Sequence, residues 1–303
     1  MEQRQPITFQ RPMRNYWQPA TQKGRIERVL YLAPEYLAAG KMTEKIAYVY
    51  LPHDYDETKA YDIFYYMHGG DHEVQAFWDS SGGTSALQNL LDNMIESKDI
   101  RPMIVVTPTF YQKKYNAYSS MKHNKGLTDL FPNEYRNYLI PVVEKRYCTY
   151  AKSIRESDLV ESRGHRGFGG FSMGAVTTWN VLMNHLDITS IFLPQSGDSW
   201  YYGIHAGGVY AEKTAGILRD SVIKAGYGMN SFSIYAATGT NDMAYPQLAS
   251  QIEAMKKHSD VFRFSHIFGE GNFYFNLAEG GFHDYEYVFM YLYNALSCYF
   301  PDI

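Results

Sequence analysis

The pentapeptide Gly170-Phe171-Ser172-Met173-Gly174 constrains the fold more than any other feature of this sequence. It has the pattern G-x-S-x-G and lies between a strand-like stretch, residues 166–171, and a helical pattern over residues 176–186. In that context the serine occupies a tight strand-to-helix turn, and the flanking glycines are needed because side chains would clash there. We therefore expect Ser172 to be a nucleophile exposed at the end of a strand. The alternative interpretation is a glycine-rich packing turn.

Short apolar runs alternate with helical patterns along the chain. Runs typical of buried strands lie at residues 63–67, 103–107, 190–193 and 232–237, and helical patterns lie at residues 87–95, 134–147, 247–257 and 285–300. This alternation predicts an α/β fold with a mostly parallel central sheet and helices on both faces. Residues 25–32 and 45–51 read as antiparallel strands at its N-terminal edge.

Two segments have less regular patterns. Residues 110–130 are rich in Tyr, Lys and Ser without a clean period, so we expect a long loop or lid. Residues 262–268 and 272–277 are both strand-like. We expect a polar N-terminal arm over residues 1–24, which carries three prolines, and a single α/β domain over residues 25–303.

Composition excludes several classes of protein. The chain has 28 Lys and Arg against 32 Asp and Glu, a formal net charge of −4, which argues against a nucleic-acid partner. Its two cysteines are too few for a disulfide scaffold or a four-cysteine zinc site. No run of about 18 apolar residues predicts a transmembrane helix, and no signal-peptide pattern is visible. The sequence leaves open whether the protein is secreted or cytoplasmic, and it leaves the oligomeric state open.

The nucleophile needs a base, which in α/β-hydrolases follows the acid in the chain. His283 lies in a glycine-rich loop just before the last helix, from which an imidazole can reach back over the sheet. His185 lies too close after Ser172, and His258 follows two lysines. His266 lies inside a strand-like stretch, so we expect it in a wall. We therefore predict His283 as the base.

Asp242 is the predicted acid. It follows a strand on a loop at the strand's C-terminal end, where sites of α/β proteins are built. Asp198 is the serious rival because it also follows a strand, whereas Glu253 and Asp260 are expected to be solvated. The chain order Ser172, Asp242, His283 leaves one more sheet element before the histidine, as the hydrolase order requires.

The oxyanion of a tetrahedral intermediate needs two backbone donors. We predict the N–H groups of Met173, at the start of a helix, and Gly70, in the loop after His68-Gly69, with Asp71 as a close alternative to Gly70. His68, Asp71, His72 and Glu73 could also be read as metal ligands, but no H-E-x-x-H pattern supports them. We expect no metal and no cofactor.

The chain resembles the feruloyl esterases of carbohydrate esterase family 1, especially the modules attached to xylanases of cellulose-degrading clostridia. The matching segments are residues 66–70, 105–110, 165–174, 196–198, 237–239, 251–255 and 271–275. The resemblance implies an α/β-hydrolase fold, the triad of Ser172, Asp242 and His283, and release of ferulate or p-coumarate from arabinoxylan or its oligosaccharides. It also implies that Trp200 lies beside the phenolic acid.

The chain departs from the family pattern where a third glycine often follows His-Gly-Gly, because Asp71 stands there. Residues 201–228 do not match closely. We predict Trp200, Asp198 and Asp71 as substrate-binding residues, and the aromatic segments around Tyr111, Tyr115, Tyr118 and residues 200–202 as holding the phenol and the sugar.

Two alternatives stay open. The same triad could serve acetyl-xylan, another short-chain ester or acyl transfer. A non-catalytic glycan-binding module that kept the fold is the other alternative.

Overall fold

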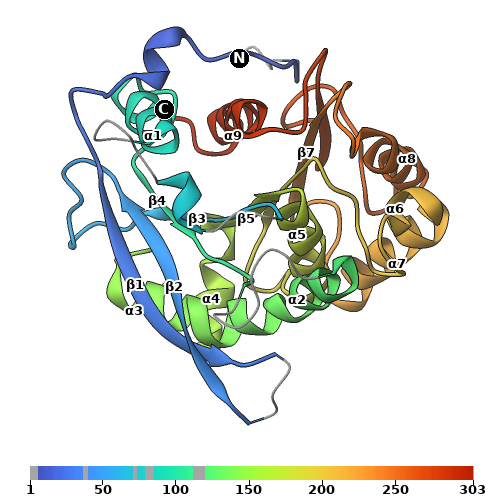
Figure 1. Cartoon of the computed structure of the whole chain (residues 1–303), viewed down its shortest axis with the longest axis horizontal. Coiled ribbons are helices and arrows are strands. Elements are labelled where there is room, and N and C mark those ends of the chain that lie inside the picture. The colour runs from blue at the N-terminus through green and yellow to red at the C-terminus, as the bar shows by residue number, and fades with distance from the viewer. Residues whose placement is uncertain (1–5, 37–39, 71–73, 79–84, 112–119, 303) are drawn as a thin grey trace.

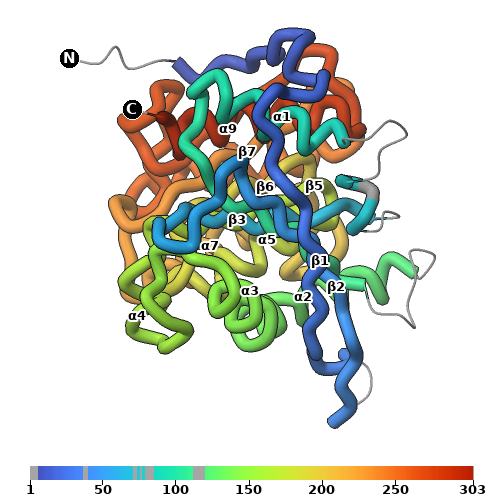
Figure 2. The backbone as a smooth tube through the Cα atoms, turned by 90° about the vertical axis from the view of Figure 1, so that its left-hand side faces the viewer, coloured from blue at the N-terminus to red at the C-terminus, as the bar shows by residue number. Residues whose placement is uncertain are grey.

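In the computed structural model, which describes residues 6–36, 40–70, 74–78, 85–111 and 120–302, eight strands form one sheet in the order β1-β2-β4-β3-β5-β6-β7-β8. The strands are β1 (Arg25–Pro34), β2 (Met42–Leu51), β3 (Asp62–Met67), β4 (Met103–Thr107), β5 (Arg166–Phe171), β6 (Ile191–Gln195), β7 (Ser233–Gly239) and β8 (Phe273–Ala278). β1 and β2 pair antiparallel, as do β2 and β4, and the other neighbours are parallel. The predicted mostly parallel sheet with an antiparallel edge is confirmed. Figure 2 shows β1 and β2 extending beyond the rest of the sheet.

Helices cover both faces of the sheet (Figure 1). They are α1 (Ala86–Glu96), α2 (Met121–Glu134), α3 (Ile140–Arg146), α4 (Glu156–Glu161), α5 (Met173–Asn184), α6 (Ala206–Val209), α7 (Ala211–Lys224), α8 (Tyr245–Lys256) and α9 (Tyr285–Tyr299). Helices α1 and α9 pack on one face, and α2, α3, α5, α7 and α8 contribute to the core on the other. Among the described helices, none has the length and apolar character required to cross a membrane.

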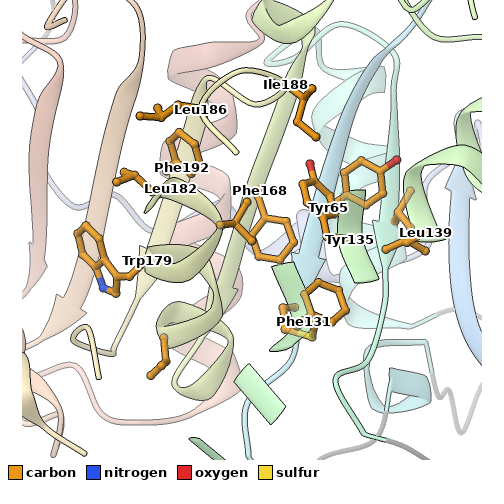
Figure 3. Packing of buried hydrophobic residues seen from close by; sticks show 14 of the residues in the cluster. Tyr65, Phe131, Tyr135, Leu139, Phe168, Trp179, Leu182, Leu186, Ile188 and Phe192 are labelled. Atoms are coloured by element: carbon orange, nitrogen blue, oxygen red, sulfur yellow. The ribbon is translucent and has the colours of Figure 1, made fainter. Parts of the chain in front are cut away.

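The alternation of side chains along the central strands builds these two cores. In β3, Ile63 and Tyr65 point into the core under α5, while Phe64 and Tyr66 point into the core under α1 and α9. All six residues of β3 are buried, as expected for a parallel strand covered on both sides. Figure 3 shows the first of these cores, where the ring of Tyr135 packs against those of Tyr65 and Phe168 from the sheet. Trp179 of α5 belongs to the same core.

The expected long loop at residues 110–130 is wrong for its second half, because helix α2 begins at Met121. The Ser120 side chain caps it by accepting the N–H of His123. The buried positions recur at helical spacing, but three of them, Asn124, Thr128 and Glu134, are polar. An apolar period is therefore not visible in the sequence.

The strand expected over residues 262–268 is also wrong. This segment meets β8 only at a single bridge, between Phe264 and Phe273. The Asn272 side chain accepts the N–H of Arg263, which removes that donor from a ladder, and Gly269 turns the chain with a φ of 84°. Strand-like composition therefore does not produce a ninth strand here.

The part of the predicted N-terminal arm that the structure describes packs against α1 and α9. Tyr16, in a 3-10 turn (η1, Arg14–Trp17), is buried, and its ring packs edge-on against Tyr293 of α9. Asn93 of α1 donates to the carbonyl of Gln18, and Asp92 accepts the N–H of Gly24. These bonds hold the segment on the α1–α9 face of the sheet.

A buried ion pair anchors the start of β5, the strand that leads to Ser172. Arg166 makes two 2.6 Å bonds to the two carboxylate oxygens of Glu144 on α3. It also donates to the carbonyls of Leu159 and Ile188, at 3.1 and 2.6 Å, so its guanidinium ties β5 to three neighbouring segments. Glu144 accepts further bonds from the hydroxyls of Tyr65 and Thr149.

We predict that Arg166→Met lowers the free energy of unfolding by about 3–5 kcal/mol, because it leaves the Glu144 carboxylate buried without its cation. Urea denaturation measures this loss. Lys152→Met is the control, since the Lys152–Glu161 pair is exposed and its loss is expected to cost less than about 1 kcal/mol. Equal effects of the two substitutions would contradict the structural role of the buried pair.

Candidate active site

Ser172 lies on a sharp turn between β5 and α5. Its backbone has φ 55° and ψ −114°, which is strained for a residue with a side chain. A Cβ added at Gly170 would lie 2.7 Å from the carbonyl oxygen of Met67, and one added at Gly174 would lie 2.3 Å from the same atom. The two glycines of the motif are therefore needed because the turn packs directly on the end of β3.

Three segments, which follow β5, β7 and β8 of the sheet, bring Ser172, His283 and Asp242 together. Asp242 follows β7, and His283 follows β8. The Nε2 atom of His283 lies 3.0 Å from Ser172 Oγ, and its Nδ1 atom lies 2.7 Å from Asp242 Oδ1. An imidazole that carries its proton on Nδ1 donates it to Asp242 and accepts the Ser172 hydroxyl on Nε2.

The surroundings of this line of three residues limit its solvent contact. Asp242 is 3% exposed, and its Oδ1 also accepts the N–H of Ala244 at 2.8 Å. The His283 ring packs against Phe171, with centroids 4.4 Å apart, and Phe171 in turn packs on Tyr285. The imidazole of His283 therefore lies between a buried carboxylate and an aromatic ring.

Asp198, the rival acid, points elsewhere. It is 1% exposed and accepts the indole N–H of Trp200 at 3.2 Å and the backbone N–H of Gly207 at 2.8 Å. Its Oδ1 lies 3.6 Å from Nδ1 of His205. Burial raises the pKa of Asp198, while His205 and these hydrogen bonds act in the opposite direction. Asp198 therefore holds Trp200 and the start of α6 in place.

The remaining histidines after Ser172 lie in other environments. His185 donates from Nε2 to the carbonyl of Pro132 at 2.7 Å, and burial lowers its pKa. His266 packs against Phe264 outside any strand, so its expected place in a strand is wrong. His205, which the sequence did not single out, lies near Asp198 and lines the cleft around Ser172.

Gly70 and Met173, the predicted oxyanion donors, lie beside each other at this cleft. A Cβ added at Gly70 would lie 2.9 Å from Met173 Sδ, and both residues line the same cavity as Ser172. The neighbouring Gly69 N–H donates to the hydroxyl of Tyr285 at 3.1 Å, so Gly69 is engaged elsewhere. Asp71 lies outside the described residues.

The cleft has a volume of about 540 Å³. Its lining includes the predicted residues Trp200 and Asp198 and also residues that the sequence did not single out: Met121, Asn124, His205, Met243, Gln247 and Tyr285. Met121 and Asn124 come from the unexpected helix α2. Tyr111 is buried and packs on His68 instead of lining the cleft, and Tyr115 and Tyr118 lie outside the described residues.

Across the described ranges, no group of three or more His, Cys, Asp or Glu side chains is arranged to hold a metal ion. His68 is buried, with Nε2 at 2.7 Å from Thr109 Oγ1 and Nδ1 at 2.7 Å from the carbonyl of Gly69. Asp71, His72 and Glu73 are not among the described residues.

The eight-stranded sheet and the strand–serine–helix turn define the chain as an α/β-hydrolase. The Esterase family model matches residues 41–289. A curated relative, endo-1,4-beta-xylanase Y of Acetivibrio thermocellus, is 38% identical over 288 residues, which are 95% of this chain and 24% of the xylanase. The chain thus spans about a quarter of the length of that relative.

Solved structures agree with this comparison. A mutant of the feruloyl esterase module from Clostridium thermocellum, complexed with sinapinate, is 36% identical, with a TM-score of 0.82, over 98% of this chain and 95% of the module. A ferulic acid esterase from Anaeromyces mucronatus shares the fold at 19% identity, with a TM-score of 0.66 over 94% of this chain and 95% of that one. The chain belongs to the Esterase family and, within it, to the carbohydrate esterase family 1 feruloyl esterases. The resemblance found in the sequence is confirmed, and the chain is a carboxylic ester hydrolase.

We predict that Gly174→Ala lowers both stability and activity. The added methyl group would press on the end of β3, which typically costs about 1–3 kcal/mol, and a displaced Ser172 lowers kcat by about a hundredfold. Thermal unfolding and ester hydrolysis measure the two effects. Gly216→Ala is the control, because Gly216 lies inside α7 with open space around its Cα, and alanine there stabilises by about 0.5–1 kcal/mol. Normal stability and kcat in Gly174→Ala would show that the close approach is not needed.

Proposed function

We propose that this chain hydrolyses hydroxycinnamate esters, such as ferulate and p-coumarate esters carried by arabinoxylan or its oligosaccharides. The observation that carries the proposal is the line of Ser172, His283 and Asp242 in a cleft walled by Trp200. The 36% identity to a feruloyl esterase module that binds sinapinate, a hydroxycinnamate, supports a hydroxycinnamate as the acyl group of the ester.

In the proposed reaction, His283 takes the proton of Ser172 as the Oγ atom attacks the ester carbonyl. Asp242 holds the imidazole in the tautomer with Nδ1 protonated and stabilises the imidazolium that forms. The N–H groups of Met173 and Gly70 hold the oxyanion. The proton passes to the departing sugar alcohol, and water, activated by His283, then attacks the acyl-enzyme and releases the acid.

Trp200 supplies the surface that suits a phenolic acyl group. Its indole is 5% exposed, its Nε1 atom donates to Asp198, and its ring packs edge-on against His205. The hydrogen bond to Asp198 and the ring contact with His205 hold the indole in one orientation. A planar ring can therefore pack on it with little loss of entropy. Asp198 acts here through Trp200 and not through the reacting atoms.

We predict a higher kcat/KM for methyl ferulate than for p-nitrophenyl acetate, measured with purified protein. Contact of the ferulate ring with the Trp200 wall supplies binding that the acetate lacks. Activity on the acetate alone would contradict the hydroxycinnamate proposal and favour a short-chain or acetyl-xylan esterase. Activity on neither ester would favour acyl transfer or a glycan-binding module.

We predict that Ser172→Ala lowers kcat on methyl ferulate by about 10⁴–10⁶ while the thermal unfolding curve stays close to that of the unmodified protein. The hydroxyl makes the covalent bond in this mechanism, and its oxygen lies 3.0 Å from His283 Nε2. A loss of less than tenfold would exclude Ser172 as the nucleophile.

We predict that Asp242→Asn lowers kcat by about 10⁴, because an amide in place of the carboxylate favours the wrong imidazole tautomer. The matched control is Asp198→Asn, which alters a carboxyl that is buried to a similar degree in the wall of the same cleft. This control is expected to raise KM or lower stability with a smaller effect on kcat. The reverse ranking would identify Asp198 as the acid.

A further inference from the structure

A second groove, with a volume of about 660 Å³, lies beside the cleft that holds Ser172. It is formed by α2, α5, α7 and the segment after Trp200. Its lining residues are Lys125, Asp129, Asn180, Met183, Asn184, Tyr201, Ile217, Asp220, Ser221, Lys224 and Ala225. None of them belongs to the proposed catalytic machinery.

The groove borders the cleft along three segments of the chain. On α2, Asn124 lines the cleft and the next residue, Lys125, lines the groove. On the segment after β6, Trp200 lines the cleft and the next residue, Tyr201, lines the groove. On α5 the lining passes from Met173 in the cleft to Asn180 in the groove, a distance of about 10 Å along the helix axis. A ligand longer than one ester group can therefore extend from Ser172 into the groove.

The charges of the groove cancel within the helices that carry them. Lys125 pairs with Asp129 one turn further along α2, and Asp220 and Lys224 lie one turn apart on α7. Two cations and two anions provide no net field for a polyanion or a polycation. The balance of charge favours a neutral ligand.

The other lining groups suit a ligand with many hydroxyls. The Tyr201 side chain is 47% exposed, and its ring touches that of Tyr202 edge-on, at a centroid distance of 4.9 Å. Exposed aromatic rings of this kind offer an apolar face and a polar tip to one ligand. The amide of Asn184 is exposed at the end of α5 and donates to the carbonyl of Asn180 at 2.7 Å, which fixes its orientation.

We propose that this groove is a subsite for the neutral saccharide chain that carries the ester. This inference rests on the proposed function, because it needs an ester of a sugar at Ser172. The acyl group occupies the cleft beside Trp200, and the sugar units beyond the ester bond extend along α5 to Tyr201 and Asn184. The groove then distinguishes an oligosaccharide ester from a small ester of the same acid.

The test compares two substrates with the same acyl group, methyl ferulate and a feruloylated xylo-oligosaccharide. Tyr201→Ala and Asn184→Ala should each lower kcat/KM for the oligosaccharide by about five- to tenfold, mainly through KM. Asn184→Ala should change kcat/KM for methyl ferulate by less than about twofold, and Tyr201→Ala should lower it less than it lowers the value for the oligosaccharide. The control is Tyr210→Ala, which removes a tyrosine of similar exposure, 49%, that lines neither cavity. Equal losses on both substrates, or no loss on either, would overturn the proposal.

A binding measurement separates this inference from the proposed function. Arabinoxylan stripped of ferulate serves as the probe, and retardation in an affinity gel measures binding by protein whose Ser172 has been blocked with a phosphonate. Among proteins blocked in this way, the one with the original sequence should be retarded more than Tyr201→Ala, Asn184→Ala and the double variant. If the protein hydrolyses methyl ferulate but the variants are retarded as much as the original sequence, the saccharide subsite would be refuted and the proposed reaction would stand. Retardation without any ester hydrolysis would refute the proposed reaction but not the saccharide site.

Discussion

The close approach of the first turn of α5 to the end of β3 is the contact on which the site depends. Gly170 and Gly174 allow that turn to lie against the carbonyl of Met67, and this contact holds Ser172 in a backbone conformation that few residues adopt. The strain is local, so neighbouring structure must hold it. The buried pair of Arg166 and Glu144 fixes the other end of β5, so the strand is held both where it begins and where it presents the serine.

Much of the fold could be predicted from the sequence because the central strands are buried on both faces. Such strands are short continuous apolar runs, and in the helices between them apolar residues recur at helical spacing on one face. Helix α2 could not be predicted in this way, because Asn124 and Thr128 occupy buried positions and bond to their surroundings instead of contributing apolar area. The prediction of a strand over residues 262–268 was wrong for the opposite reason. The apolar alternation of a strand is present, but the Asn272 side chain accepts the N–H of Arg263, which a strand would need for its ladder.

The meeting of the three residues of the proposed triad could be predicted, and the walls around them only in part. Ser172, Asp242 and His283 each follow a strand, and their order in the chain matches that of a known reaction type. No comparable rule predicts a wall. His205 and Gln247 reach the cleft because α6 and α8 fold back over it, and the sequence contains no pattern that indicates such an approach. Trp200 was found through a resemblance to relatives and not through its own pattern.

The proposed triad and the walls of the cleft and groove lie on different parts of the fold, which affects how such a protein can evolve. The proposed reacting groups follow the ends of β5, β7 and β8, whereas much of the walls comes from α2, from residues 197–228 and from the start of α8. A substitution at an exposed wall residue such as Tyr201 leaves the strained turn and the Arg166–Glu144 pair untouched, so it carries little cost in folding. Specificity for acid and sugar can therefore drift separately from the hydrolytic step, and residues 201–228, which match the family least, are where relatives would be expected to diverge first.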